Sequence, residues 1–353
     1  MKRYDKYEDW VEVISENLPE IPKIITGEWL KEQLLDRKSY FRNWGFCFAD
    51  LKEHEFEDTI DASIIRKVPF STRTIFPKNH PFHFNENIFH TFDDVRNLHE
   101  LGIDGSGVNV AVIDFTFDTV PNELKECLNN FVNLNDKAEV HFHGTTVSTQ
   151  FCGKNLGIAP KSKLWFYGTG QGKKNIEDDI LALKDIYKQN QKGANIKIIN
   201  ISGSSHMDIL EFEDIYIKLL EQECYIIDSI IFGENFTTIN QDSNTKEYYY
   251  SDWQILGMGE KELKSKIAIP TGGKMTPLVT TENDYLYCGQ STYSWGIPIL
   301  SGYFALALQI NPNLTYNEFV ELAKKTKTEK EGIQLFNING IINELNKEKS
   351  NKM

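Results

Sequence analysis

The pattern of apolar positions predicts alternating strands and helices from about residue 92 onward. Short apolar runs have the length and β-branched content of buried strands, at residues 108–113, 163–167, 196–201, 225–232 and 267–269. Helical patterns, with apolar residues every three or four positions, lie between several of these runs, at residues 176–189 and 209–220. This alternation predicts an α/β fold, in which helices cover both faces of a parallel sheet and function lies at the C-terminal ends of the strands.

The first 84 residues follow a different pattern. Residues 7–18 and 28–37 have near-helical apolar spacing, and residues 77–87 contain the Pro and Asn typical of a loop. We therefore expect a small, mostly helical N-terminal extension over residues 1–84. The main domain is expected over residues 85–345, followed by a Lys-rich tail over residues 346–353.

A serine stands where a long apolar helix is expected to begin. Ser294 and Pro298 lead into the apolar residues 299–310, and proline is tolerated in a first helical turn. Unpaired N–H groups and the helix dipole favour negative charge at this end of a helix. A nucleophilic serine needs such a place, although a simple capping serine gives the same local pattern.

The two partners that a serine nucleophile requires precede it in the chain. The apolar run at 108–113 ends in Asp114, which puts a carboxylate at the C-terminal end of a predicted buried strand. His143 then precedes another helix-like segment. The order Asp, His, Ser is the one found in subtilisin.

These motifs resemble those of the subtilisin-like serine proteases, the subtilases. Residues 110–113 and Asp114 match the family's aspartate motif, although Phe115 and Thr116 replace its usual small pair. The histidine motif is matched by residues 143–145, while Thr146 stands where the family has a second histidine.

The serine motif is matched in its spacing more than in its residue types. Ser294, Pro298 and Gly302 have the family's separations, and the other residues of 292–296 depart from its usual types. Ser291 copies the beginning of the motif but has the wrong distance to the proline, so we rank it below Ser294. The resemblance covers about residues 87–328.

The resemblance implies a serine endopeptidase that cleaves an extended peptide or protein, as in intracellular processing. Ser294 would be the nucleophile, His143 its base, and Asp114 the group that orients the base. The family's oxyanion asparagine is matched by Asn235, which otherwise reads as a turn residue after a strand. The alternative function is a catalytically impaired subtilase that binds or scaffolds a partner.

Substrate-binding residues are implied in the same way. Ser202, Gly203 and Ser204 resemble the family segment that pairs with the substrate backbone, and an ordinary strand end is the other interpretation. Glu234 is a candidate for the floor of a pocket that favours a basic side chain, although a solvated loop carboxylate fits the sequence as well.

Composition limits the kinds of partner that we expect the protein to bind and the cellular compartment in which we expect it. The net charge of −13 argues against nucleic acid and anionic membranes as partners. The 5 cysteines show no close pairing, and no long apolar segment or signal-peptide pattern is present, so we expect a cytoplasmic protein without disulfides. His141 and His143 form only a weak HxH signal, so neither a metal nor a cofactor is expected.

The N-terminal extension has a regulatory interpretation. Subtilases commonly carry an N-terminal pro-region that blocks the cleft, and residues 66–70 have the basic, extended character of a segment that could lie across it. An extension that only packs on the core is the alternative.

Overall fold

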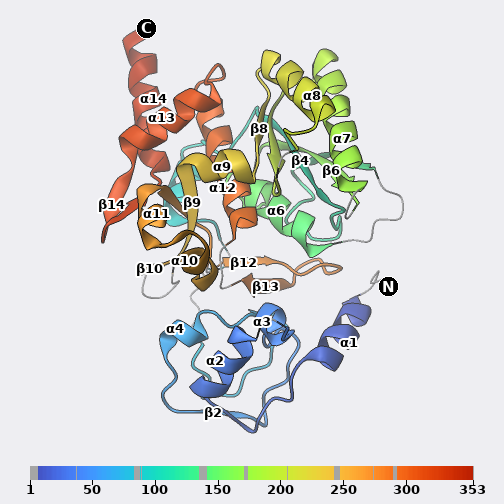
Figure 1. Ribbon diagram of the computed structural model, residues 1–353, viewed down its shortest axis with the longest axis vertical. Coiled ribbons are helices and arrows are strands. Elements are labelled where there is room, and N and C mark those ends of the chain that lie inside the picture. Colours follow the sequence, from blue (N-terminus) through green and yellow to red (C-terminus); the bar gives the residue numbers. More distant parts are fainter. Residues whose placement is uncertain are drawn as a thin grey trace.

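The computed structural model describes residues 7–36, 38–82, 88, 90–134, 141–170, 174–204, 206–241, 247–272, 274–288 and 292–352. Figure 1 shows two layers along the long axis of the molecule. The larger layer holds the main sheet and the long helices, and the N-terminal helices form a smaller layer beneath the hairpin of β12 (Lys274–Pro277) and β13 (Tyr285–Cys288).

A five-stranded parallel sheet organises the larger layer, in the order β5-β6-β4-β7-β8. Its strands are β4 (Asn109–Phe115), β5 (Leu128–Asn133), β6 (Lys163–Thr169), β7 (Ile196–Ile201) and β8 (Tyr225–Ile227). The side chains of β4 alternate between the two faces, as the strand period of two requires. Val110 and Val112 enter one core cluster, and Ala111 and Ile113 enter the other.

Helices cover both faces of this sheet, so the predicted fold class is confirmed. One face packs on α6 (Phe142–Cys152) and α12 (Tyr293–Ile310), which form its core with the buried side of the sheet. The other packs on α7 (Lys174–Gln191) and α8 (Leu210–Glu221). Both β4 and β7 therefore end at the edge of the sheet where α6 and α12 begin.

One predicted strand is wrong in its second half. The apolar run at 225–232 forms a strand only to Ile227, and α9 (Ser229–Asn235) begins directly after it. Asp228 explains the change, because its Oδ1 accepts the N–H groups of Ile230 and Ile231 and so caps the helix. Apolar content alone does not distinguish a strand from a buried helical turn.

A second five-stranded sheet lies beside the main one. A mixed sheet has the order β10-β9-β11-β15-β14, and the predicted strand at 267–269 is part of it instead of the main sheet. Its strands are β9 (Phe236–Gln241), β10 (Tyr248–Tyr249), β11 (Ile267–Pro270), β14 (Thr328–Lys330) and β15 (Ile333–Leu335). The remaining helices of this layer are α5 (Asp93–Glu100), α10 (Asp252–Met258), α11 (Glu260–Ser265), α13 (Tyr316–Thr326) and α14 (Ile338–Lys352). Residues 346–352 of the predicted Lys-rich tail are helical and continue α14.

The N-terminal region has its own apolar cluster but shares it with the main domain. Its elements are α1 (Tyr7–Asn17), β1 (Ile24–Ile25), α2 (Gly27–Leu35), α3 (Phe41–Trp44), β2 (Glu55–Phe56), α4 (Ala62–Ile65) and β3 (Phe70–Ser71). Met275 and Tyr287, from the hairpin of β12 (Lys274–Pro277) and β13 (Tyr285–Cys288), complete the cluster. β3 also pairs with β13, so this region adds a strand to the main domain.

Candidate active site

A short polar contact at the end of the main sheet joins Asp114 and His143. Asp114 stands near the C-terminal end of β4, and His143 lies in the first turn of α6. Nδ1 of His143 donates to Oδ1 of Asp114 at 2.7 Å, and the same oxygen accepts the Phe115 N–H at 2.8 Å. The Asp114 contact fixes the imidazole with its proton on Nδ1, which leaves Nε2 free to act as a base.

The surroundings of His143 shift its proton affinity in opposite directions. Burial lowers the pKa of His143, whereas the charge of the Asp114 carboxylate and its hydrogen bond raise it. The two raising effects together are the larger, so the pKa lies above 6.5. The ring also lies tilted against Trp295, with centroids 5.2 Å apart. His143 is therefore held between a charged partner and an aromatic face.

His141 has a structural role that the HxH pattern did not reveal. Its Nδ1 accepts the His143 N–H at 3.1 Å, which makes it the N-cap of α6. Burial lowers the pKa of His141, and the neighbouring His143 lowers it further. A neutral imidazole suits this role because only an unprotonated Nδ1 can accept a hydrogen bond.

Gly144 allows α6 to approach β4 closely. A Cβ at this position would lie 2.2 Å from the carbonyl oxygen of Phe115. Any other residue would push the start of α6 away from the end of the strand, and with it His143 away from Asp114. The glycine after the histidine is thus a geometric requirement of the pair.

Ser294 lies in the first turn of α12 and is tied to the end of β7. Its Oγ donates to the Ser202 carbonyl at 3.3 Å, and the Ser202 Oγ donates to the Ser294 carbonyl at 3.1 Å. The neighbouring Trp295 carries the contact to His143. Asp114 and His143 are in direct contact, and Ser294 is the residue before Trp295, whose ring packs on His143. Ser294 Oγ itself is not hydrogen-bonded to His143 in this structure.

Small residues let α12 pass deep between its neighbours. A Cβ on Gly296 would lie 2.4 Å from the Thr238 side chain, and Ser301 donates to Asn200 of β7 at 3.2 Å. Gly296 therefore allows the helix to pack tightly at this point, where a larger residue would clash with Thr238. This packing fixes Ser294 relative to β7.

A cavity of about 170 Å³ opens beside the Asp114–His143 pair. Ser202, Gly203 and Ser204, the segment expected to bind substrate, line it together with the pair. The same cavity has polar residues that the sequence analysis missed: Thr169 from β6, Asp179 from α7, and His206 from the turn before α8. The structure thus brings the predicted substrate segment to the predicted catalytic pair.

A sequence signal for Asp179 was present. Asp179 lies three positions after Ile176 and four before Leu183, so it occupies the apolar face of α7. A carboxylate at such a position is buried on folding, and charged side chains are rarely buried without a partner or a function. His206 gave no comparable signal.

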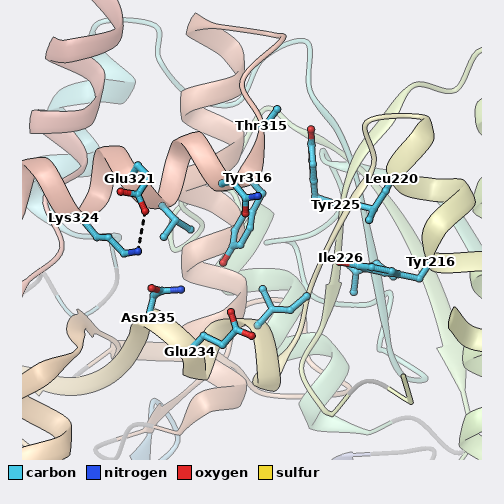
Figure 2. Close-up of a pocket in the computed structure, with 13 residues that line it drawn as sticks. Tyr216, Leu220, Tyr225, Ile226, Glu234, Asn235, Thr315, Tyr316, Glu321 and Lys324 are labelled. Atoms are coloured by element: carbon cyan, nitrogen blue, oxygen red, sulfur yellow. Dashed lines mark hydrogen bonds and ion pairs between the residues drawn. The ribbon is translucent and has the colours of Figure 1, made fainter. Parts of the chain in front are cut away.

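Asn235 and Glu234 lie elsewhere, at the C-terminal end of α9. They line a separate cavity of about 790 Å³, shared with Tyr216, Tyr225 and Tyr316, and no residue lining it also lines the cavity of the catalytic pair. Figure 2 shows Asn235 and Glu234 beside Tyr316 and the Glu321–Lys324 ion pair. The proposed oxyanion role of Asn235 assumed a strand up to Phe232, and α9 replaces that strand.

The structure also bears on the alternative serine, the cysteines and the possible metal site. Ser291 lies outside the described residues. Cys47, Cys127, Cys152 and Cys224 are buried free thiols. Within the ranges that the structure covers, no three His, Cys, Asp or Glu side chains group as metal ligands, and no helix is long and apolar enough to cross a membrane.

The segment expected to lie across the cleft packs elsewhere. Val68 and Phe70 are buried in the N-terminal cluster, and Arg66 lies over the ring of Tyr249 at 3.6 Å. The N-terminal region approaches the site through Trp44, whose ring lies 6.1 Å from that of Phe142, the residue before His143.

Comparison with known proteins gives structural matches only. No family model and no curated protein matches the sequence. The prenylagaramide maturation protease PagA is similar, with 16% identity, a TM-score of 0.50, and coverage of 72% of this chain and 99% of that chain. The PatG macrocyclase in complex with peptide and the subtilase cytotoxin SubAB each give 13% identity, a TM-score of 0.53, and coverage of 72% of this chain and 96% of theirs.

Identities this low show a common fold and leave the reaction open. The matching structures include protease and macrocyclase domains. The chain therefore has the α/β fold of subtilisin-like domains.

Proposed function

We propose that the protein is a serine endopeptidase that hydrolyses peptide bonds through Asp114, His143 and Ser294. The observation that carries the proposal is the 2.7 Å contact between His143 Nδ1 and Asp114 Oδ1, made beside the helix turn that holds Ser294. A structural ion pair has no need of a serine at a neighbouring helix N-terminus. The likeness to PagA and PatG, both peptide-processing proteins by name, supports the same class of substrate.

In the proposed reaction each of the three groups has its own role. His143 Nε2 takes the proton from Ser294 Oγ as that oxygen attacks the substrate carbonyl carbon, and Asp114 stabilises the imidazolium that forms. The imidazolium then gives the proton to the leaving amine, and the acyl group stays on Ser294. Water, deprotonated by the same Nε2, releases the acid and restores the serine.

Two features are suited to stabilising the negative oxygen of the tetrahedral intermediate and to binding the substrate backbone. The Ser294 N–H belongs to the first turn of α12, where backbone donors lack partners within the helix. Ser202, Gly203 and Ser204 continue β7 beyond its last strand residue and border the cavity of the catalytic pair. An extended peptide can add to such a segment as a strand, which would present its carbonyl to Ser294.

One observation favours the alternative of a binding protein without turnover. Ser294 Oγ donates to the Ser202 carbonyl, and a hydroxyl held there does not give its proton to His143. The 3.3 Å length of this bond is at the weak end of the range, and catalytic hydrogen bonds are often formed only when substrate binds.

A fluorophosphonate probe separates the two functions, because it labels only an activated serine. We expect labelling of the full chain, its loss in Ser294→Ala and His143→Ala, and its retention in the matched control Ser291→Ala. Each of the first two variants should also reduce peptide turnover by about 10⁴-fold or more, since triad members act as one unit. Labelling that survives Ser294→Ala would contradict the assignment.

Mass spectrometry of the products distinguishes hydrolysis from transfer to an amine. Hydrolysis gives two linear fragments whose combined mass exceeds that of the substrate by one water. A cyclic product instead would assign the chain to acyl transfer, with the same nucleophile and base.

A further inference from the structure

A second buried carboxylate, Asp179, borders the cavity of the catalytic pair. It is 3% exposed and comes from α7, on the side of the cavity opposite α6. Its contact with His206 is long, at 3.5 Å between Oδ2 and Nε2. The reaction described above gives Asp179 no task.

Two other aspartates, Asp114 and Asp178, lie close enough to Asp179 to affect its charge. Asp114 is already engaged with His143, and Asp178, the neighbour of Asp179, accepts the N–H of Gly170 at 2.8 Å. Burial raises the pKa of Asp179 to about 7, and the charges of Asp114 and Asp178 add to the effect. Among the described residues, His206 is the basic side chain that the structure places within ion-pair distance of Asp179, and His143 faces Asp114 instead.

A buried carboxylate in this setting is costly unless a cation pairs with it. The 170 Å³ cavity has the size of a side chain and not of a folded partner. It also borders Ser202, Gly203 and Ser204, so it is open to the side chains of a peptide bound along that segment. Side chains of an extended peptide alternate in direction, so only alternate ones can point toward Asp179.

We propose that Asp179 forms a subsite that selects a lysine or arginine side chain of the substrate, on the N-terminal side of the cleaved bond. The proposal rests on the proposed peptidase function for its orientation. Asp179 acts on binding, while Asp114 and His143 act on the reacting atoms. His206 contacts the same carboxylate, so the substrate cation either displaces His206 from Asp179 or binds Asp179 beside it.

The test uses the full chain and a series of peptides. A single lysine is moved through successive positions on the N-terminal side of the cleaved bond, and each peptide is matched by one with norleucine, which keeps the apolar stem without the charge. We expect kcat/KM to favour lysine at one position by about tenfold to a hundredfold, as for a buried hydrogen bond to a charged group. Asp179→Asn should remove that preference, so that the kcat/KM values of the lysine and norleucine peptides become equal within about threefold.

Asp214→Asn is the matched control. Asp214 is an exposed aspartate on α8, so this variant removes the same charge without touching the cavity. The lysine preference should survive in it. Equal loss in both variants would mean that the preference comes from the overall negative charge of the protein, and the subsite would be refuted.

Binding to the Ser294→Ala variant keeps the subsite and the reaction separate. Lysine peptides should bind this variant about tenfold or more tightly than norleucine peptides, and the difference should vanish when Asp179→Asn is added. Selective binding without turnover in the parent chain would overturn the peptidase and support the subsite. Turnover without lysine preference, or binding that ignores the charge, would overturn the subsite.

Discussion

At the residue scale, His143 determines when the site can react. The hydrogen bond to Asp114 holds the pKa of His143 above 6.5 against the opposing effect of burial. Only the neutral imidazole accepts a proton, so kcat/KM should rise with pH and reach half of its maximum above pH 6.5. A profile measured from about pH 5 to 9 with an uncharged peptide checks this prediction.

The control removes the cause of the shift. Asp114→Asn should lower the pKa of His143 below 6.5, because burial then acts alone, and an NMR titration of the imidazole measures it without turnover. An unchanged titration midpoint would show that the Asp114 contact does not tune His143.

Asp179 should reduce the stability of the fold at neutral and higher pH. The pKa of its carboxyl is about 7 in the folded chain against 3.8 for an unperturbed aspartate, so the native state retains a proton that the unfolded state loses. The free energy of unfolding therefore falls as pH rises from about 4 to 7. Asp179→Asn removes this effect and should stabilise the protein by about 1–3 kcal/mol at pH 8.

Denaturant unfolding at several pH values measures the change. The gain from Asp179→Asn should be full at pH 8 and shrink toward zero near pH 4, while Asp214→Asn should change little at any pH. A variant that is less stable than the parent at pH 8 would mean that Asp179 is satisfied in the folded chain.

At the element scale, the start of α6 depends on an unusual cap. His141 Nδ1 accepts the N–H of His143, so the same turn carries the cap and the base. His141→Ala should destabilise the protein by about 1 kcal/mol, as for the loss of other N-caps, and should lower kcat by loosening His143. His141→Asn supplies another cap and should restore most of both.

Thermal melting and peptide hydrolysis of the three proteins provide the comparison. Restoration by asparagine would identify capping as the role of His141. Failure of asparagine together with full stability would mean that the imidazole itself takes part in the reaction.

At the scale of the whole molecule, the N-terminal region is part of the main domain's packing. Phe70 pairs with Tyr287 between β3 and β13, and the same cluster buries Met275. Deleting residues 1–84 uncovers the edge of β13 and the apolar faces of these residues. We expect the truncated chain to aggregate, and co-expression of residues 1–84 to restore solubility.

The opposite result has a clear meaning. A truncated chain that is soluble and hydrolyses peptides faster than the full chain would support a region that restrains the site. The placement of Trp44 against Phe142 is the contact through which such restraint would act. Peptide hydrolysis and light scattering of both chains decide between the two.

The sequence by itself determined the fold class and the order of the reactive groups. The β-branched run at 196–201 forms a strand, and the alternation of such runs with helical patterns predicts a parallel sheet covered on both faces. Asp114, His143 and Ser294 could be named because each stands at the boundary of a strongly patterned element. Local pattern is a good guide where burial and periodicity agree.

Tertiary structure decided what local pattern could not. Asp228 turned an apolar run into a helix, which moved Asn235 and Glu234 to another cavity. Asp179 and His206 line the cavity beside Asp114 and His143, although they belong to segments far from both in the sequence. Which side chains face one cavity depends on how strands and helices that are far apart in the sequence pack together. The local pattern of apolar and polar residues does not describe this packing.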